Sequence, residues 1–277
     1  MMCVICECKN KDNYDSIINL THLQCHNCPL LTEIPSTFVN LTELYCWNCP
    51  LITDLSDVPA TLVNLTRLDC YKYPLLKEIP STLIKLTKLY CYNCPLLTTI
   101  PSTLVVNLTK LYCNGCPLLT DLSGVPSTLV KLTTLSCNGC PLLTTIPSTL
   151  VKLTTLSCNG CPLLKEIPST FVNLTYLECS YCPLLKEIPS SFVYLTRLEC
   201  RNNYYLYLTN EQLRIQDSKH VNQSESREYL KLKFDFIHTY KKEYLIKLLA
   251  WNINTVKNSK SKSWFSSDLC RCIINYL

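Results

Sequence analysis

The residues of this chain with the greatest capacity for chemistry are its cysteines, which number 21 among 277 residues. Seven pairs in the body of the chain are spaced as Cys-x-x-Cys, for example Cys25 with Cys28 and Cys137 with Cys140. That spacing is typical of zinc coordination and of thiol–disulfide exchange. The four histidines are few and scattered, which disfavours a histidine-based catalytic site. The cysteines therefore have to be judged by the elements that would position them.

The cysteine pairs belong to a longer sequence repeat that begins at Leu20. Each unit reads Leu-Thr-x-Leu-x-Cys-x-x-Cys-Pro-Leu-Leu-x-x-Ile-Pro-Ser-Thr-(Leu/Phe)-Val-(Asn/Lys), and it restarts at Leu41, Leu65, Leu86, Leu108, Leu132, Leu153, Leu174 and Leu195. Eight units are complete, with lengths of 21 to 24 residues, and the ninth decays. A period of this length indicates a solenoid, in which each unit buries its apolar face only against its neighbours.

The first half of each unit predicts a short β-strand. Leu-x-x-Leu-x-Cys ends in an alternation of apolar and variable residues, which is the pattern of a strand with one face inward. The proline after the second cysteine ends that strand. Strands of successive units would stack in parallel about 4.8 Å apart.

The unit Leu-x-x-Leu-x-Cys-x-x-Cys-x-x-Leu-x-x-Ile-Pro-x-x-Leu-x-x resembles the leucine-rich repeat, and it is nearest the plant disease-resistance type. That type places Gly-Cys before a turn, as Gly115-Cys116, Gly139-Cys140 and Gly160-Cys161 do here. Cysteine-rich repeat proteins of giant DNA viruses are also similar. The resemblance covers residues 20 to about 206. It implies an α/β leucine-rich-repeat solenoid with a curved, parallel β-sheet on the concave face and short irregular or 3-10 segments on the convex face. No nucleotide-binding or signalling domain accompanies the repeats, so the resemblance does not imply an immune-receptor role.

The same resemblance assigns the cysteines to packing. The first cysteine of each pair stands where the family has an inward leucine, and a free cysteine packs as a small hydrophobe. The second stands at the family's Asn/Cys ladder site, where Tyr73 and Asn203 replace it. A zinc site would tolerate neither replacement. Cys3, Cys6 and Cys8 align with core positions of a degenerate first unit. We therefore predict no metal site, no cofactor and no enzymatic activity, and a zinc- or redox-active cysteine protein is the least favoured alternative.

In this fold the outward strand positions are the third, fifth, seventh and eighth of each unit, and they are the variable ones. Aromatic and charged residues at such positions are typical anchors of protein interfaces. Cross-strand tyrosine pairs also stabilise a sheet by about 0.2 to 1 kcal/mol each, so a purely structural role is the alternative. The predicted partner-binding residues are Tyr45, Trp47, Arg67, Asp69, Tyr71, Tyr90, Tyr92, Tyr112, Tyr176 and Tyr181.

Three regions are expected: a degenerate N-terminal repeat or cap over residues 1–19, the solenoid over residues 20–206, and a mostly α-helical cap over residues 207–277. Thr209 to Gln212 fits a helix capping box. A C-terminal cap would cover the open edge of the solenoid. Residues 265–277 weakly resemble the opening helix of an F-box, so a ubiquitin-ligase substrate adaptor is an alternative function.

Charge and targeting patterns bear on partners and compartment. Residues 1–203 contain equal numbers of basic and acidic residues, so the net charge of +5 arises in residues 204–277. This balance disfavours a nucleic-acid surface on the repeats. The sequence has no signal-peptide pattern and no apolar run of membrane-spanning length. We expect a cytoplasmic protein with reduced thiols that binds a protein partner and no membrane, with its oligomeric state left open.

Overall fold

The computed structural model describes residues 19–28, 31, 34–47, 49, 55, 61–105, 107–120, 122, 131–203, 205–209, 212 and 215. The chain divides into two compact units, Met1–Lys219 and His220–Leu277, and every described residue belongs to the first. The degenerate unit with Cys3, Cys6 and Cys8, most of the predicted helical cap and the F-box-like segment lie outside the described residues.

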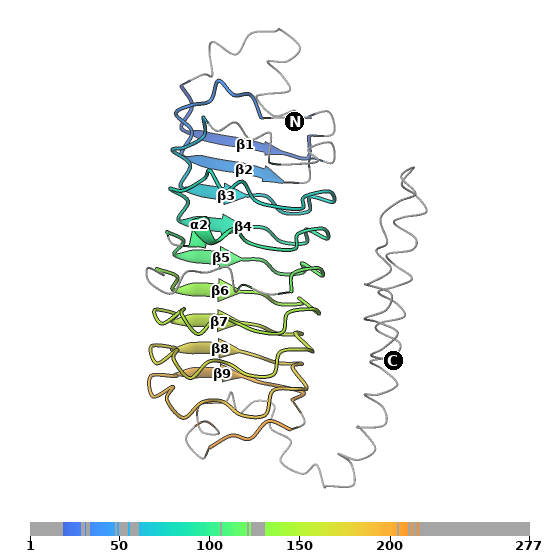
Figure 1. Ribbon diagram of the computed structural model, residues 1–277, viewed down its shortest axis with the longest axis vertical. Coiled ribbons are helices and arrows are strands. Elements are labelled where there is room, and N and C mark those ends of the chain that lie inside the picture. The colour runs from blue at the N-terminus through green and yellow to red at the C-terminus, as the bar shows by residue number, and fades with distance from the viewer. Residues whose placement is uncertain are drawn as a thin grey trace, which may run out of the picture. The chain divides into compact units, whose positions relative to one another are not determined.

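Each repeat contributes one short strand to a single parallel sheet (Figure 1). Pairing follows chain order from β1 to β9, and residues at the same repeat position face each other, as Leu23 faces Leu44. The predicted parallel solenoid is confirmed. Its elements are β1 (His22–His26), β2 (Glu43–Trp47), β3 (Arg67–Asp69), β4 (Lys88–Tyr90), α2 (Ser102–Val105), β5 (Lys110–Tyr112), β6 (Thr134–Ser136), β7 (Thr155–Ser157), β8 (Tyr176–Glu178) and β9 (Arg197–Glu199).

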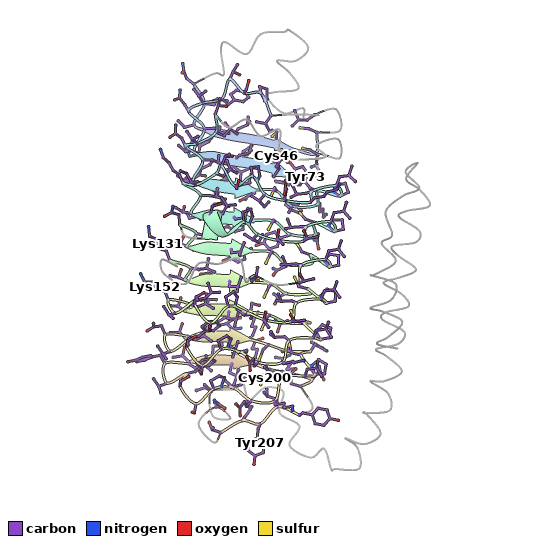
Figure 2. All side chains as sticks on the ribbon, in the orientation of Figure 1. Cys46, Tyr73, Lys131, Lys152, Cys200 and Tyr207 are labelled. Carbon is purple, nitrogen blue, oxygen red and sulfur yellow. The ribbon has the colours of Figure 1, made fainter. Side chains whose placement is uncertain are left out.

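The apolar positions of the repeat form one continuous core behind the sheet. The strand residues alternate as predicted, so that in β1 Leu23 and Cys25 are buried while their neighbours are exposed. Figure 2 shows Cys46 and Cys200 at the levels of β2 and β9, and both are part of this core. Because each unit repeats the same buried leucine, cysteine and isoleucine positions, the units stack without a change of register.

A ladder of threonines holds the starts of the strands together. The backbone N–H and the hydroxyl of Thr42 both donate to the carbonyl oxygen of Thr21, at 2.8 and 2.9 Å. The equivalent threonine of each later unit repeats this pair of bonds, ending with Thr196 on Thr175. The Thr of the Leu-Thr dipeptide therefore satisfies a backbone acceptor of the preceding unit.

The eighth repeat position lies in a turn past the strand and not on the sheet, which corrects the prediction that it faces outward. Its residues adopt the left-handed backbone conformation, with φ between 52° and 67°, a region that glycine occupies without steric cost and asparagine tolerates. The members are Asn27, Lys72, Asn93, Gly115, Gly139, Gly160, Tyr181 and Asn202. The Gly-Cys dipeptides of three units thus reflect a turn requirement.

The last described residues continue the solenoid beyond β9. Tyr207 donates its backbone N–H to the carbonyl oxygen of Lys186 at 2.7 Å. The predicted capping box is present, because Thr209 and Gln212 exchange side-chain to backbone hydrogen bonds of 3.0 and 3.3 Å. The amide of Gln212 also donates to the carbonyl oxygen of Ile188 at 3.0 Å, which ties this short cap to the eighth unit. Within the described part of the chain, no helix is long and apolar enough to cross a membrane.

Candidate binding face

The paired cysteines form a hydrogen-bonded ladder inside the solenoid. In six units the second cysteine donates its thiol to the carbonyl oxygen of the first cysteine of the preceding unit, as Cys140 does to Cys113 at 3.2 Å. Asn203 fits the same site, because its amide donates to the carbonyl oxygen of Cys179 at 2.6 Å and accepts the N–H of Cys182 at 2.7 Å. The remaining thiol rungs are Cys49 on Cys25, Cys94 on Cys70, Cys116 on Cys91, Cys161 on Cys137 and Cys182 on Cys158.

The environment of these thiols favours packing over reactivity. All cysteines of the described residues are buried thiols. Burial raises the pKa of Cys70 and Cys179 well above the ordinary thiol value, and it raises the pKa of Cys200 to about 11. Hydrogen bonds from Cys91 and Cys94 lower the pKa of Cys116 to about 4, and one from Cys158 lowers the pKa of Cys182, but both side chains are fully buried. A reactive cysteine needs an accessible thiolate, which a fully buried side chain does not supply. Among the described residues, no cluster of three or more His, Cys, Asp or Glu side chains could hold a metal ion.

Eight of the ten predicted partner-binding residues gather on β2 to β5 and the turns that follow β3 and β4. We call this set the aromatic face: Tyr45, Trp47, Arg67, Asp69, Tyr71, Tyr90, Tyr92 and Tyr112. Each of these side chains is half-buried, because it packs against its neighbours on the adjacent strands. The register of the sheet aligns Tyr45, Asp69, Tyr90 and Tyr112 in one row across four strands.

The rings of the aromatic face are stacked along the sheet direction. The ring of Trp47 lies between those of His26 and Tyr71, with centroid separations of 4.7 and 5.0 Å. Tyr90 and Tyr112 stack at 4.8 Å with an interplanar angle of 6°. These separations match the spacing of neighbouring parallel strands, about 4.8 Å. The sheet itself therefore sets the stacking.

Arg67 joins the two halves of the aromatic face. Its guanidinium carbon lies 4.7 Å from the ring centroid of Tyr45 and 4.7 Å from that of Tyr90. Two hydrogen bonds of 3.1 and 3.0 Å connect the guanidinium to both carboxylate oxygens of Asp69. These bonds hold the pKa of Arg67 above its ordinary value. The planar guanidinium thus lies between the rings of Tyr45 and Tyr90, where a third ring would otherwise complete the stack.

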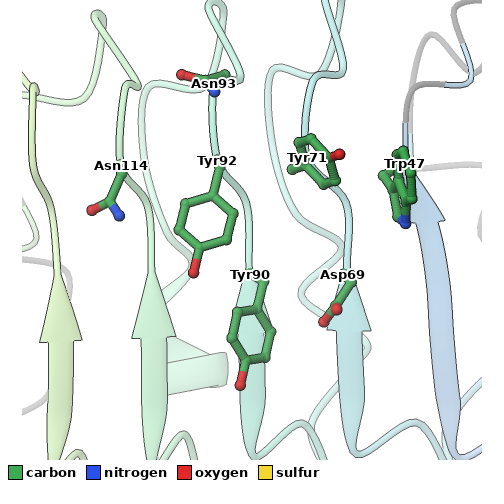
Figure 3. Close-up of a pocket in the computed structure, with 7 residues that line it drawn as sticks. All are labelled: Trp47, Asp69, Tyr71, Tyr90, Tyr92, Asn93 and Asn114. Atoms are coloured by element: carbon green, nitrogen blue, oxygen red, sulfur yellow. The ribbon is translucent and has the colours of Figure 1, made fainter.

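A shallow pocket of about 400 Å³ opens on the aromatic face (Figure 3). Figure 3 shows Tyr71 and Tyr92 past the ends of β3 and β4, and Asp69 and Tyr90 at the last residues of those strands. Trp47, Asn93 and Asn114 complete the lining. Burial raises the pKa of Tyr92 and Tyr90, so both phenols keep their protons and act as hydrogen-bond donors at neutral pH.

The next strands carry a polar ladder that sequence reasoning missed. The side-chain oxygen of Asn138 accepts hydrogen bonds from the hydroxyl of Ser157 and the backbone N–H of Asn159, at 2.8 and 2.7 Å. Asn114 and Asn159 accept the equivalent backbone N–H of the following unit. Ser136 and Ser157 are buried, although they occupy outward positions. The small polar residues of β6 and β7 therefore bond to the solenoid itself.

The two remaining predicted residues are separated from the aromatic face by β6 and β7. Tyr176 on β8 donates a hydrogen bond to Glu178 and carries the guanidinium of Arg197 at 4.9 Å from its ring centroid. Burial and that bond raise the pKa of Tyr176 to about 12. Tyr181 lies in the left-handed turn after β8 and is 59% exposed. The structure therefore brings together eight of the ten residues and leaves these two apart.

Comparisons with known proteins agree with this architecture. A family model described as leucine-rich repeats in two copies matches residues 106–150, and a single-repeat model matches residues 19–41, 152–174 and 173–195. No curated protein sequence matches the chain. Among solved structures, the leucine-rich repeat domain of the type III effector XopL is similar, with a TM-score of 0.52 and 19% identity over 74% of this chain and 83% of that one.

A second similar structure is that of a TLR13–ssRNA13 complex, with a TM-score of 0.53 and 19% identity over 73% of this chain. This chain spans 33% of the TLR13 chain. Identities this low show a shared fold and nothing about ligands. The recurring sequence unit, the one strand that each unit adds to a parallel sheet, and the family-model matches together show that the solenoid of this chain is built of leucine-rich repeats.

Proposed function

We propose that the protein is a non-catalytic scaffold that binds a protein partner on its aromatic face. The observation that carries the proposal is the cluster of Tyr, Trp and Arg side chains on four successive strands, with a pocket between them. These are the residue types that dominate interface hot spots. Four strands about 4.8 Å apart span roughly 15 Å, which is the size of an interface centre.

The packing of the face supports this function energetically. A free aromatic side chain loses rotamer freedom when a partner immobilises it, at a cost of about 0.5 to 1.5 kcal/mol. Trp47 is already held between His26 and Tyr71, and Tyr90 between Arg67 and Tyr112. Their ordering cost is thus met on folding, which leaves more of the contact energy for binding. The leucine-rich-repeat fold is generally an interaction scaffold, which agrees with a non-enzymatic role.

A photo-crosslinking experiment tests the proposal. The photoreactive residue p-benzoylphenylalanine replaces Tyr92 on the aromatic face in one variant and Tyr194 in a control. Tyr194 is 62% exposed and lies on the segment that connects β8 to β9, so the control presents the same probe away from the sheet. We expect the Tyr92 variant alone to crosslink one predominant protein. Equal crosslinking patterns from both positions, or crosslinks only from position 194, would contradict the proposal.

A further inference from the structure

The ring faces of the central aromatics are not open to a partner. Trp47 has His26 against one face and Tyr71 against the other. Tyr90 has the guanidinium of Arg67 on one side and the ring of Tyr112 on the other. The rings therefore present their edges to a partner. Ring edges carry the positive end of the aromatic quadrupole, and the phenol hydroxyls and indole N–H are hydrogen-bond donors.

The charges that border this surface are also positive. Lys88 on β4 and Lys110 on β5 stand side by side in the register, in the row next to Tyr90 and Tyr112. Lys72, in the turn after β3, places its ammonium nitrogen 5.6 Å from the ring centroid of Tyr71. None of the ion pairs among the described residues involves these three lysines.

The carboxylates of the same surface are already engaged. Both oxygens of Asp69 accept hydrogen bonds from Arg67. Glu43 accepts the hydroxyl of Tyr45, and His22 lies 3.9 Å from it. Their negative charges are therefore partly offset by close donors, whereas the ammonium groups of Lys72, Lys88 and Lys110 remain available. The surface as a whole offers donors and positive charge.

From this arrangement we infer that the aromatic face recognises an acidic protein segment, whose carboxylates contact Lys88, Lys110 and Lys72 while its apolar side chains contact the ring edges. This inference rests on the proposed function and names the chemistry of its partner. Single-stranded nucleic acid fits the surface less well, because its bases bind by stacking on open ring faces, and both faces of Trp47 and Tyr90 are covered.

Defined probes test the inference on the full chain. Fluorescence anisotropy measures binding of three labelled ligands: a dodecapeptide of alternating Glu and Tyr, its Lys and Tyr counterpart, and a dodecauridylate. We expect the acidic peptide to bind at least tenfold more tightly than either other probe, and more weakly as NaCl is raised from 50 to 200 mM, because exposed charges are screened over about 10 Å. Tighter binding of the basic peptide or of the oligonucleotide, or no binding of the acidic peptide at millimolar protein, would overturn the inference.

Matched charge reversals locate the site. Changing Lys88→Glu together with Lys110→Glu should weaken acidic-peptide binding at least tenfold. The control pair Lys165→Glu and Lys186→Glu makes the same change at exposed positions on return segments and should leave binding within twofold. Equal losses in both pairs would contradict the site, and circular dichroism melting curves verify that all variants fold.

Two sets of variants distinguish failure of the acidic-segment inference from failure of the scaffold function. If the crosslinked protein loses affinity on Trp47→Ala but keeps it on the Lys88 and Lys110 reversals, the scaffold function stands and the acidic-segment inference fails. Loss of that protein's binding in both sets of variants is the result that we expect.

Discussion

The outward rows of β2 to β5 and of β6 and β7 lie on the same sheet and cover the same core, yet their side chains make different interactions. On β2 to β5 the side chains stack on one another, as Tyr90 does on Tyr112. On β6, β7 and the turns that follow them the side chains bond to the neighbouring unit: the side-chain oxygen of Asn138 accepts hydrogen bonds from the hydroxyl of Ser157 and the backbone N–H of Asn159. The repeat backbone is common to both regions, so the difference arises entirely from the variable positions.

The two regions differ in whether their outward side chains stabilise the fold or remain accessible to a partner. In the polar region the hydroxyls of Ser136 and Ser157 are buried and bonded to asparagine side chains within the solenoid. In the aromatic region the rings are half-buried, and those of Trp47, Tyr71, Tyr90 and Tyr92 line a pocket of about 400 Å³. We therefore expect substitutions on β6 and β7 to change stability and substitutions on β2 to β5 to change binding.

The largest effect on stability is expected in the core, where the two regions should not differ. Cys137→Ser should lower the free energy of unfolding by about 1 to 3 kcal/mol, because it buries a hydroxyl at a site that favours an apolar group. Cys91→Ser is the matched change beneath the aromatic face and should cost the same within about 0.5 kcal/mol. Urea denaturation of both variants measures this. A clear difference between them would mean that the two regions do not share one core.

A smaller loss is expected from the polar ladder. Asn138→Ala removes the acceptor of two hydrogen bonds and should cost about 1 to 2 kcal/mol of unfolding free energy. Tyr92→Ala, at the same repeat position two units earlier, should cost about 1 kcal/mol or less, because an outward ring contributes mainly cross-strand contacts. If the tyrosine variant proved the less stable of the two, the division between supporting and available side chains would be wrong.

Substitutions at the eighth repeat position, in the left-handed turn, should change stability least. The sign of the change should differ between the polar and the aromatic region. Gly139→Ala should destabilise by about 1 kcal/mol, because an L-residue is strained at φ +64° while the new Cβ would lie an ordinary 3.9 Å from the backbone of Gly115. Lys72→Gly should stabilise by a few tenths to about 1 kcal/mol, because it relieves the same strain at φ +61°. Thermal melting curves provide the readout. Stabilisation by alanine at position 139 would be incompatible with a left-handed turn there.

The sequence predicted the fold well because one pattern recurs nine times. The alternation around Leu23 and Cys25 determined strand position, inward face and register together. The Leu-Thr dipeptide recurred just as regularly, but its ladder was missed, because a threonine hydroxyl bonded to a neighbouring carbonyl leaves no hydropathy pattern. The recurrence of a threonine at the same position in every unit was the available signal.

The sequence predicted which outward residues form the candidate site, but it did not predict the contacts between their side chains. That Tyr45, Tyr90 and Tyr112 share a row follows from the register alone. The placement of Arg67 between Tyr45 and Tyr90 depends on side-chain rotamers across three strands, which spacing does not determine. The sequence prediction placed Tyr181 on the outward face of the sheet, whereas it lies in the left-handed turn. That turn usually contains Gly or Asn, so a tyrosine there was interpreted as one more outward residue.

The affinity of the crosslinked protein partner for paired alanine variants tests the central claim most directly. Trp47→Ala and Tyr90→Ala remove rings from the aromatic face, and the control variants Thr134→Ala and Thr155→Ala truncate outward side chains on β6 and β7. We expect each of the first two to cost about 2 kcal/mol, roughly a 30-fold rise in Kd by isothermal titration calorimetry, and each of the last two to change Kd by less than about threefold. Unchanged affinity for Trp47→Ala and Tyr90→Ala, with binding lost on the threonine variants or on neither pair, would contradict the claim and leave the rings with a purely structural role.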